Sequence, residues 1–241
     1  MRTDRIRLGH LVTCAPFRHP ALLAKMAATV DVLSGGRLEL GLGWGSDPSE
    51  LERFGFGLQA PAERAARLEE TLEVLQRMFA GRPFDHAGRH YRLEGAVGRP
   101  VPAQPRIPVH LGGSGPQLTM PLVRRHADWW NCPSYAADRL AELRPLAGAA
   151  RVSVQHPVGL APDRASRDEV AALARRRFGS WGGLVVGTAE EVAEALLRDV
   201  ELGAEGFVLQ FADFGAPETL RRFATDVAPL VRAAATRRRT G

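Results

Sequence analysis

The segment HLGGSGPQLTM (110–120) contains the residues best suited to hold an anion. Three glycines and a serine follow its predicted strand: Gly112, Gly113, Ser114 and Gly115. Glycine lets a ligand approach the backbone closely, and the serine adds a hydroxyl. Pro116 is expected to begin the next helix, whose positive N-terminal end would face the same point. The segment predicts a phosphate site, and a glycine-rich turn that only connects strand to helix fits it equally well.

Polar side chains also follow two other predicted strands. GLGWGSDPSE (41–50) brings Asp47 and Ser49 to the C-terminal end of one of them. Asp47 is equally suited to cap a helix that begins at the next residue, and both roles are compatible. Asn131 ends the strand predicted from ADWWN (127–131), in which the two adjacent tryptophans point to opposite faces. These side chains are candidate ligand contacts.

The histidines and cysteines form no recognisable catalytic or metal-binding set. His10 stands at the end of the first predicted strand together with Thr13, and it is the one histidine considered as a proton donor. His110 and His156 lie within predicted strands and are expected to be structural. Four others are expected at the surface: His19, His86, His90 and His126. The two cysteines form no CxxC pair, so we expect neither a disulfide nor a metal site.

The composition is that of a soluble globular protein, with 45% hydrophobic and 24% charged residues among 241. No apolar run is long enough for a membrane span, and the N-terminus lacks a signal peptide, so a cytoplasmic location is expected. The net charge is +5. Many arginines alternate with acids, as in ERAARLEE, which is typical of a solvated helix face, and we expect no nucleic-acid partner.

Short apolar runs alternate with amphipathic helical segments along the chain. The predicted strands are 5–12, 37–43, 107–113, 127–131, 152–160 and 206–211, and the predicted helices include 20–36, 63–81, 188–205 and 216–235. This alternation predicts a parallel sheet, either a barrel or an open sheet. Residues 44–106 form an excursion with a hairpin at 84–95. We predict one domain over 1–241, with a frayed tail at 235–241.

Taken together, these segments resemble the luciferase-like monooxygenase superfamily, especially its branch that uses the deazaflavin coenzyme F420. The strongest likeness is in RIRLGHLVTCAPFRHPALLAKMAATVDVLSGGRLELGLGWG. Four later segments agree with it in the same order: ERAARLEETLEVLQRMFAGRPFDHAGRHYRLEGA, PVHLGGSGP, ADWWN and VGTAEEVAEALLRDVELGAEGFVLQFAD. The resemblance implies a TIM barrel, with the cofactor across the C-terminal ends of its strands.

The resemblance also implies roles for individual residues. The first strand would end in a bulge with a non-prolyl cis bond between His10 and Leu11, against which the deazaflavin ring rests, and Thr13 would contact the ring. The segment 112–115 would bind the phosphate. Asp47, Ser49 and Asn131 would stand at positions where polar residues approach the cofactor.

Two departures from the family accompany this likeness. Trp129 stands where the family has a small residue. The six predicted strands are two fewer than a complete barrel has, so the first two βα units of the family are apparently lacking. The missing units include the part that carries the family's catalytic histidine, so the catalytic residues of this chain stay unknown. Two interpretations stay open: Met1 is an internal methionine of a longer enzyme, or the barrel is a shortened one. A shortened, open barrel would expose its edge strands, so for that form we expect a homo-oligomer.

The function that this resemblance implies is hydride transfer between F420 and a small organic substrate. Two alternatives stay open: an FMN-dependent monooxygenase of the same fold, and a truncated cofactor-binding protein without turnover.

Overall fold

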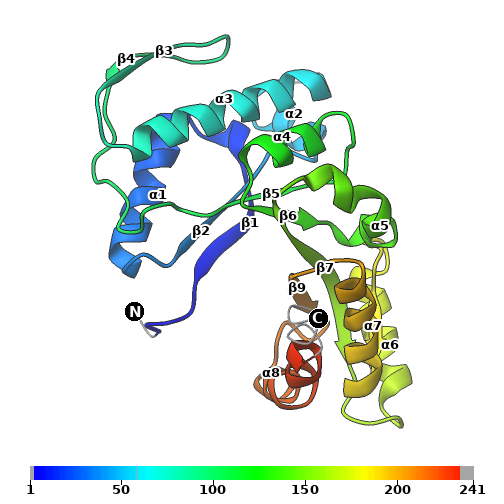
Figure 1. Cartoon of the computed structure of the whole chain (residues 1–241). Helices are drawn as coiled ribbons and strands as arrows, with labels where there is room; N and C mark the ends of the chain where they lie inside the picture. The colour runs from blue at the N-terminus through cyan, green and yellow to red at the C-terminus, as the bar shows by residue number, and fades with distance from the viewer. Residues whose placement is uncertain (1–2, 58, 234–241) are drawn as a thin grey trace. The chain divides into compact units, whose positions relative to one another are not determined.

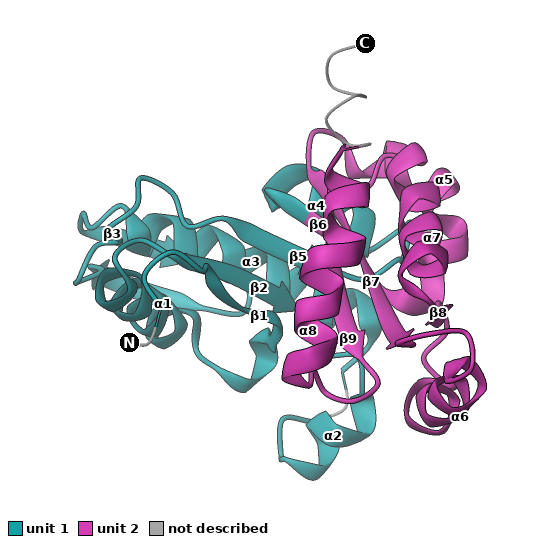
Figure 2. Cartoon of the chain, turned by 90° about the horizontal axis from the view of Figure 1, so that it is seen from below, with its two compact units in different colours: residues 1–129 teal, residues 130–241 magenta. Residues whose placement is uncertain are grey.

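The structure is a computed structural model that describes residues 3–57 and 59–233. The chain divides into two compact units, residues 1–129 and 130–241 (Figure 2), and each is described by itself. The expectation of one domain over the whole chain stays a prediction. The expected frayed tail at 235–241 lies outside the described residues.

The first unit is built on three parallel strands in the order β1 (Leu8–Cys14), β2 (Leu38–Gly43) and β5 (Val109–Gly112) (Figure 1). All three were predicted, although β1 begins three residues later than expected. The register between β1 and β2 shifts between His10 and Thr13, so β1 contains the expected bulge.

The helices of this unit are α1 (Pro20–Ser34), α2 (Pro48–Arg53), α3 (Pro61–Phe79) and α4 (Thr119–His126), with a 3₁₀ turn at Ala15–Phe17. As predicted, α1 starts at a proline and ends at Gly35, whose φ of 68° suits glycine. The helix expected at Pro116 begins three residues later instead. The N–H groups of Thr119 and Met120 both donate to the Gly115 carbonyl, which makes residues 116–118 a turn.

The predicted hairpin is present as the antiparallel pair β3 (Phe84–Ala87) and β4 (Arg92–Ala96). It is fixed to α3 by the buried Glu70. This carboxylate accepts hydrogen bonds from the N–H groups of His90 and Tyr91 (2.8 Å each) and lies 2.9 Å from Nε2 of His86. The hairpin within the segment 44–106 is therefore held against α3 of the first unit.

The strands of the second unit are β7 (Arg151–Leu160), β8 (Val185–Gly187) and β9 (Gly206–Phe211), and β6 (Trp129–Cys132) begins at the boundary. Strand β7 pairs in parallel with both β8 and β9. The sequence did not predict β8, which is three residues long and preceded by two glycines. Apart from the hairpin, the described residues thus contain seven strands, not six.

Helices of the second unit cover its strands. They are α5 (Leu140–Leu143), α6 (Arg167–Phe178), α7 (Ala189–Glu201) and α8 (Pro217–Arg222), with 3₁₀ turns at Ser134–Arg139 and Arg144–Ala147 and a π-helical turn at Phe223–Val227. The predicted capping box of α7 is confirmed, since the Thr188 N–H donates to the Glu191 carboxylate at 2.8 Å. None of the helices in the described ranges is long and apolar enough to cross a membrane.

Candidate functional site

The end of β1 lies against glycines of β2 and β5. A side chain at Gly41 would overlap the His10 carbonyl oxygen, and one at Gly43 would start 2.8 Å from Cγ2 of Val12. A Cβ at Gly112 would lie at an ordinary 3.6 Å from Cγ1 of the same valine. The bulge of β1 therefore requires glycine at 41 and 43, and Val12 brings the ends of β1, β2 and β5 together.

The non-prolyl cis bond lies between Leu11 and Val12, so the predicted position between His10 and Leu11 was wrong by one bond. Both residues fall in the register shift, where neither has a partner on β2. Nothing in the sequence indicates which bond of such a bulge is cis. His10 is exposed and Thr13 is half-buried. Val12, which sequence reasoning did not single out, makes the contacts with the glycines.

Two glycines of the loop after β5 lie close to the side chain of Thr119. Gly113 has φ of 118°, and a Cβ there would lie 3.1 Å from Cγ2 of Thr119. A Cβ at Gly115 would lie 3.3 Å from the hydroxyl of the same threonine. The loop and Ser114 are half-buried. The predicted phosphate segment thus turns closely against Thr119, the first residue of α4, and its contact with a phosphate stays a prediction.

Asp47 caps α2, as one of its two predicted roles required. Its Oδ1 accepts hydrogen bonds from the Ser49 hydroxyl (2.7 Å), the Ser49 N–H (2.9 Å) and the Glu50 N–H (3.3 Å). The Ser49 hydroxyl, followed by the two backbone N–H groups, lowers the pKa of Asp47. Asp47 and Ser49 are exposed and lie together, and their contact with a cofactor stays a prediction.

Asn131 belongs to the second unit, whereas the other predicted site residues belong to the first. It is buried, and its Oδ1 accepts a hydrogen bond from the Ser153 hydroxyl at 3.0 Å. The side chain therefore connects β6 to β7.

A cation from α3 that sequence reasoning missed lies against the loop after β2. The Arg64 guanidinium lies 5.5 Å from the centroid of the Trp44 ring and donates to the Gly45 carbonyl. Arg64 comes from α3 and is buried, so it holds this loop beside the end of β1. Its signal in the sequence was weak, because it stands in a run of alternating charges that resembles a solvated helix face.

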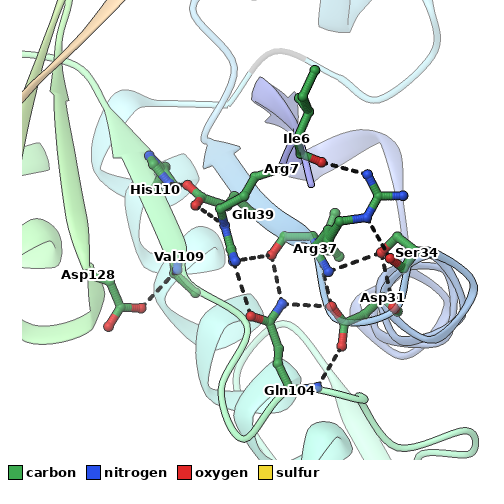
Figure 3. Close-up of polar contacts among 11 residues, drawn as sticks. Ile6, Arg7, Asp31, Ser34, Arg37, Glu39, Gln104, Val109, His110 and Asp128 are labelled. Atoms are coloured by element: carbon green, nitrogen blue, oxygen red, sulfur yellow. Dashed lines mark hydrogen bonds and ion pairs between the residues drawn. The ribbon is translucent and has the colours of Figure 1, made fainter. Parts of the chain in front are cut away.

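A second group that the sequence did not reveal is a polar network centred on Glu39 (Figure 3). One carboxylate oxygen of Glu39 accepts from Nε of Arg7, and the other lies 2.5 Å from Nε2 of His110. Nη2 of Arg7 also donates to the Gln104 side chain at 3.1 Å. The available signal was Glu39 itself, the one charged residue in the apolar strand β2.

Three histidines expected at the surface are mostly buried beside acids. The exposed fractions of the His86, His90 and His126 side chains are 9%, 6% and 12%. His86 contacts Glu70. His90 lies 3.6 Å from Glu63, and His126 lies 3.3 Å from Glu69. All three acids come from α3. These contacts fix the hairpin and α4 to α3.

A cavity of about 570 Å³ lies between α3 and the segment 101–107. Its walls are mainly apolar, with Leu72, Leu75 and Phe79 on the helix side. None of the predicted cofactor-binding residues lines it. The predicted cofactor-binding residues of the first unit lie instead along β1, at the end of β5 and in the segments after β2 and β5, whereas Glu39 lies near the start of β2.

A sequence profile of the family described as luciferase-like monooxygenase matches residues 1–165. The chain is also similar to the protein Rv0953c of Mycobacterium tuberculosis, with 34% identity over 128 residues. The match covers 53% of this chain and 44% of that protein, so it spans less than half of the relative.

Two solved structures resemble the chain over 95% of its length. The monooxygenase RslO1 from Streptomyces bottropensis has a TM-score of 0.80 at 22% identity, with 79% of its own chain covered. An F420-dependent secondary alcohol dehydrogenase in complex with an F420-acetone adduct has a TM-score of 0.76 at 20% identity, with 81% covered. These likenesses show the predicted fold, the α/β barrel of the luciferase-like type.

Proposed function

The chain belongs to the luciferase-like monooxygenase family, and on this basis we propose that it is an oxidoreductase that binds F420 and transfers hydride between this deazaflavin and an organic substrate. The observation that carries the proposal is the set of glycines at the ends of β2 and β5. They let the bulge of β1 and the Thr119 side chain approach the ends of these strands closely, and in this proposal the flat ring rests on that bulge and the phosphate on the loop 112–115.

In this proposal each part of the first unit has a separate task. Val12 and the bulge of β1 support the ring, and Thr13 lies beside it. The phosphate is held by the cradle of Gly112, Gly113, Ser114 and Gly115. Arg64 adds positive charge beside the loop after β2. The deazaflavin supplies the hydride chemistry when bound, and the protein positions the reactants.

FMN is the alternative cofactor, because it also combines a flat ring with a phosphate. The glycines at the ends of β2 and β5 (Gly41, Gly43 and Gly112) are called the glycine floor here. This floor and the phosphate cradle would accept either molecule. The preference for F420 rests on the segment from Arg5 to Gly45, whose resemblance is to the F420-dependent branch of the family.

The proposal is tested by incubating the purified chain with F420 or FMN, removing free cofactor by gel filtration and recording absorption spectra. We expect F420 to be retained and FMN to be lost. Retained F420 is then mixed with a panel of short secondary alcohols, the substrate class named for one structural neighbour, and its absorbance is followed. Retention of FMN alone would transfer the proposal to the flavin-dependent alternative.

A further inference from the structure

The imidazole of His110 is held in one orientation from two sides. Its Nε2 lies 2.5 Å from Oε2 of Glu39, and its ring is parallel to that of Trp129, with an interplanar angle of 3° and 5.6 Å between centroids. The Glu39 carboxylate is in turn held by Nε of Arg7 (Figure 3). Carboxylate, imidazole and aromatic ring come from three different strands and form one rigid assembly.

These contacts determine where the imidazole carries its proton. A carboxylate that already accepts from Arg7 is an acceptor for the histidine as well, so Nε2 is the protonated nitrogen of the neutral ring. The lone pair is then on Nδ1, the nitrogen that can take up a proton. The protonated ring would lie beside the Glu39 carboxylate and parallel to the Trp129 ring.

Nδ1 of His110 makes no hydrogen bond within the part of the chain that the structure describes. The buried polar atoms without a partner in the described residues are Nε of Arg64, Nε of Arg67 and Nε2 of His90. Nδ1 of His110 is not one of them, so this nitrogen is accessible rather than buried. The nitrogen is therefore open to a ligand. The side chain as a whole is 13% exposed, compared with 25% for Glu39 and 44% for Arg7. The network thus extends from a half-buried imidazole to side chains that are exposed to solvent. A proton can therefore be exchanged between the imidazole and the solvent.

The assembly lies on the same face of the strands as the proposed cofactor floor. Along β2, the side chains alternate, so Glu39 shares its face with Gly41 and Gly43. His110 lies opposite Gly41 in the parallel register and shares its face with Gly112, two residues further along β5. The imidazole is thus level with Gly41 and one layer of side chains below Gly43 and Gly112.

Few other charges lie near this ring. Asp128 accepts from the Val109 N–H at 2.8 Å, but it is paired with Arg106 at 2.9 Å and so contributes little net charge. Asp31 lies behind β2, where it accepts from the N–H groups of Leu38 and Ala103 and from the Gln104 side chain. Among residues 3–57 and 59–233, Arg7 is the charged group paired with the Glu39 carboxylate of the assembly.

We propose that His110, positioned by Glu39, is the acid–base residue of this site. Its Nδ1 exchanges a proton with the hydroxyl or carbonyl oxygen of an alcohol or ketone substrate. When the substrate is an alcohol, its O–H bond breaks, the Nδ1–H bond forms, and the charge on the imidazole is balanced by Glu39. This assignment rests on the proposed function, and it replaces the exposed His10, which the sequence offered as proton donor.

The chain offers a matched control. His126 also has its Nε2 beside a glutamate on a neighbouring element, and its side chain is 12% exposed, with Glu69 at 27%. It borders the cavity beside α3, away from the glycine floor. Replacement of His126 by Gln therefore removes a histidine of the same burial and pairing without touching the proposed site.

The test uses the full chain labelled with ¹⁵N-histidine, with signals assigned through the H110Q and H126Q variants. Long-range ¹H–¹⁵N spectra are expected to show His110 protonated at Nε2, and to lose this preference in E39Q. In the F420-dependent assay with short secondary alcohols, H110Q is expected to slow turnover about 100-fold or more, with the Kd for F420 changed less than about threefold. H126Q is expected to stay within about twofold of wild type, and added imidazole is expected to restore part of the activity of H110A.

Each contrary result has a definite meaning. Protonation at Nδ1 in the wild type, near-normal turnover of H110Q, or failure of imidazole to restore H110A would overturn the assignment. A chain that binds F420 but turns over none of the alcohols overturns it as well, because the assignment requires a hydroxyl- or carbonyl-bearing substrate. A chain that binds no F420 contradicts the proposed function itself, and with it the site that His110 would serve.

Discussion

The indole of Trp129 and the imidazole of His110 lie parallel, with 3° between their planes and 5.6 Å between their centroids. The family resemblance assigns a small residue to the position of this tryptophan. In this chain the larger ring covers one face of His110 and leaves the edge of the imidazole to Glu39. Trp129, which departs from the family pattern, therefore stacks on a histidine of the polar network, and this network lies on the same face of the strands as the glycine floor.

Replacing Trp129 by alanine removes the ring that covers His110, whereas phenylalanine keeps a stacking partner. Aromatic pairs contribute about 0.5–1.5 kcal/mol beyond their buried area. We expect W129A to lower the free energy of unfolding by at least about 1 kcal/mol more than W129F. Urea unfolding of both variants measures the difference, and equal losses would show that the stacking contributes nothing.

Gly41 is expected to tolerate no side chain, because a Cβ there would overlap the His10 carbonyl at the bulge of β1. Forcing such an overlap costs about 1–3 kcal/mol. Gly112 is the control, since a Cβ at that position meets Val12 at an ordinary 3.6 Å. Thermal unfolding should show a clear loss for G41A and a much smaller one for G112A. The reverse order would mean that the bulge does not lie over β2 as described.

Glu70 is expected to make the stability of the first unit depend on acid pH. Burial raises the pKa of its carboxyl, but the hydrogen bonds from the His90 N–H, the His86 ring and the Tyr91 N–H outweigh burial and lower the pKa below 4.5. The lowered pKa stabilises the fold fully above the unfolded value. This contribution disappears as the pH falls through the folded value.

The variant E70Q should therefore be less stable at pH 7, by about 1–3 kcal/mol, and should show a flatter loss of stability below pH 5. Glu73, one turn further along α3 and exposed, is the control. Urea unfolding of E70Q and E73Q between pH 3 and pH 7 distinguishes the two positions. Identical curves would contradict the role given to Glu70.

His156 and Asp199 form a buried pair in the second unit. Nδ1 of His156 donates to the Gly183 carbonyl at 2.7 Å, and its Nε2 lies 2.7 Å from Oδ2 of Asp199. Leaving a buried polar group without its hydrogen-bond partner costs about 1–3 kcal/mol, and we expect this loss in D199A. D199N keeps a polar group beside Nε2 and should lose less. A D199A protein as stable as wild type in urea would show that the pair is dispensable.

The sequence predicted the long, periodic elements well and the short ones poorly. Strand β9 has the predicted bounds, and α1 starts and ends at the expected proline and glycine. Strand β8 was missed because it has only three residues, next to glycines, which is too short to show a periodic pattern of apolar residues. The start of α4 was misplaced because Pro116 lies in a turn that is set by the Gly115 carbonyl, a contact that no local pattern indicates.

The candidate site could be predicted where one segment carries it, and not where distant segments meet. The cradle at 112–115 lies in one loop, and its glycines were visible in the sequence. Glu39 and His110 are 71 residues apart and become partners only because β2 and β5 are neighbours. Trp129 was noticed as a departure from the family, but its partner could not be identified before the strands were placed.

The most direct test of the central claim is a fluorescence titration of the purified chain with F420 and with FMN, repeated on two glycine variants. G113A places a Cβ in the phosphate cradle at φ 118°, and G35A places one in open space at φ 68°, so the thermal stability of both variants is measured beside their binding. We predict micromolar binding of F420, weakened at least tenfold by G113A and unchanged by G35A, with weaker binding of FMN. Equal binding by both variants, or no binding of either cofactor by the wild type, would contradict the proposal that this chain is an F420-dependent oxidoreductase.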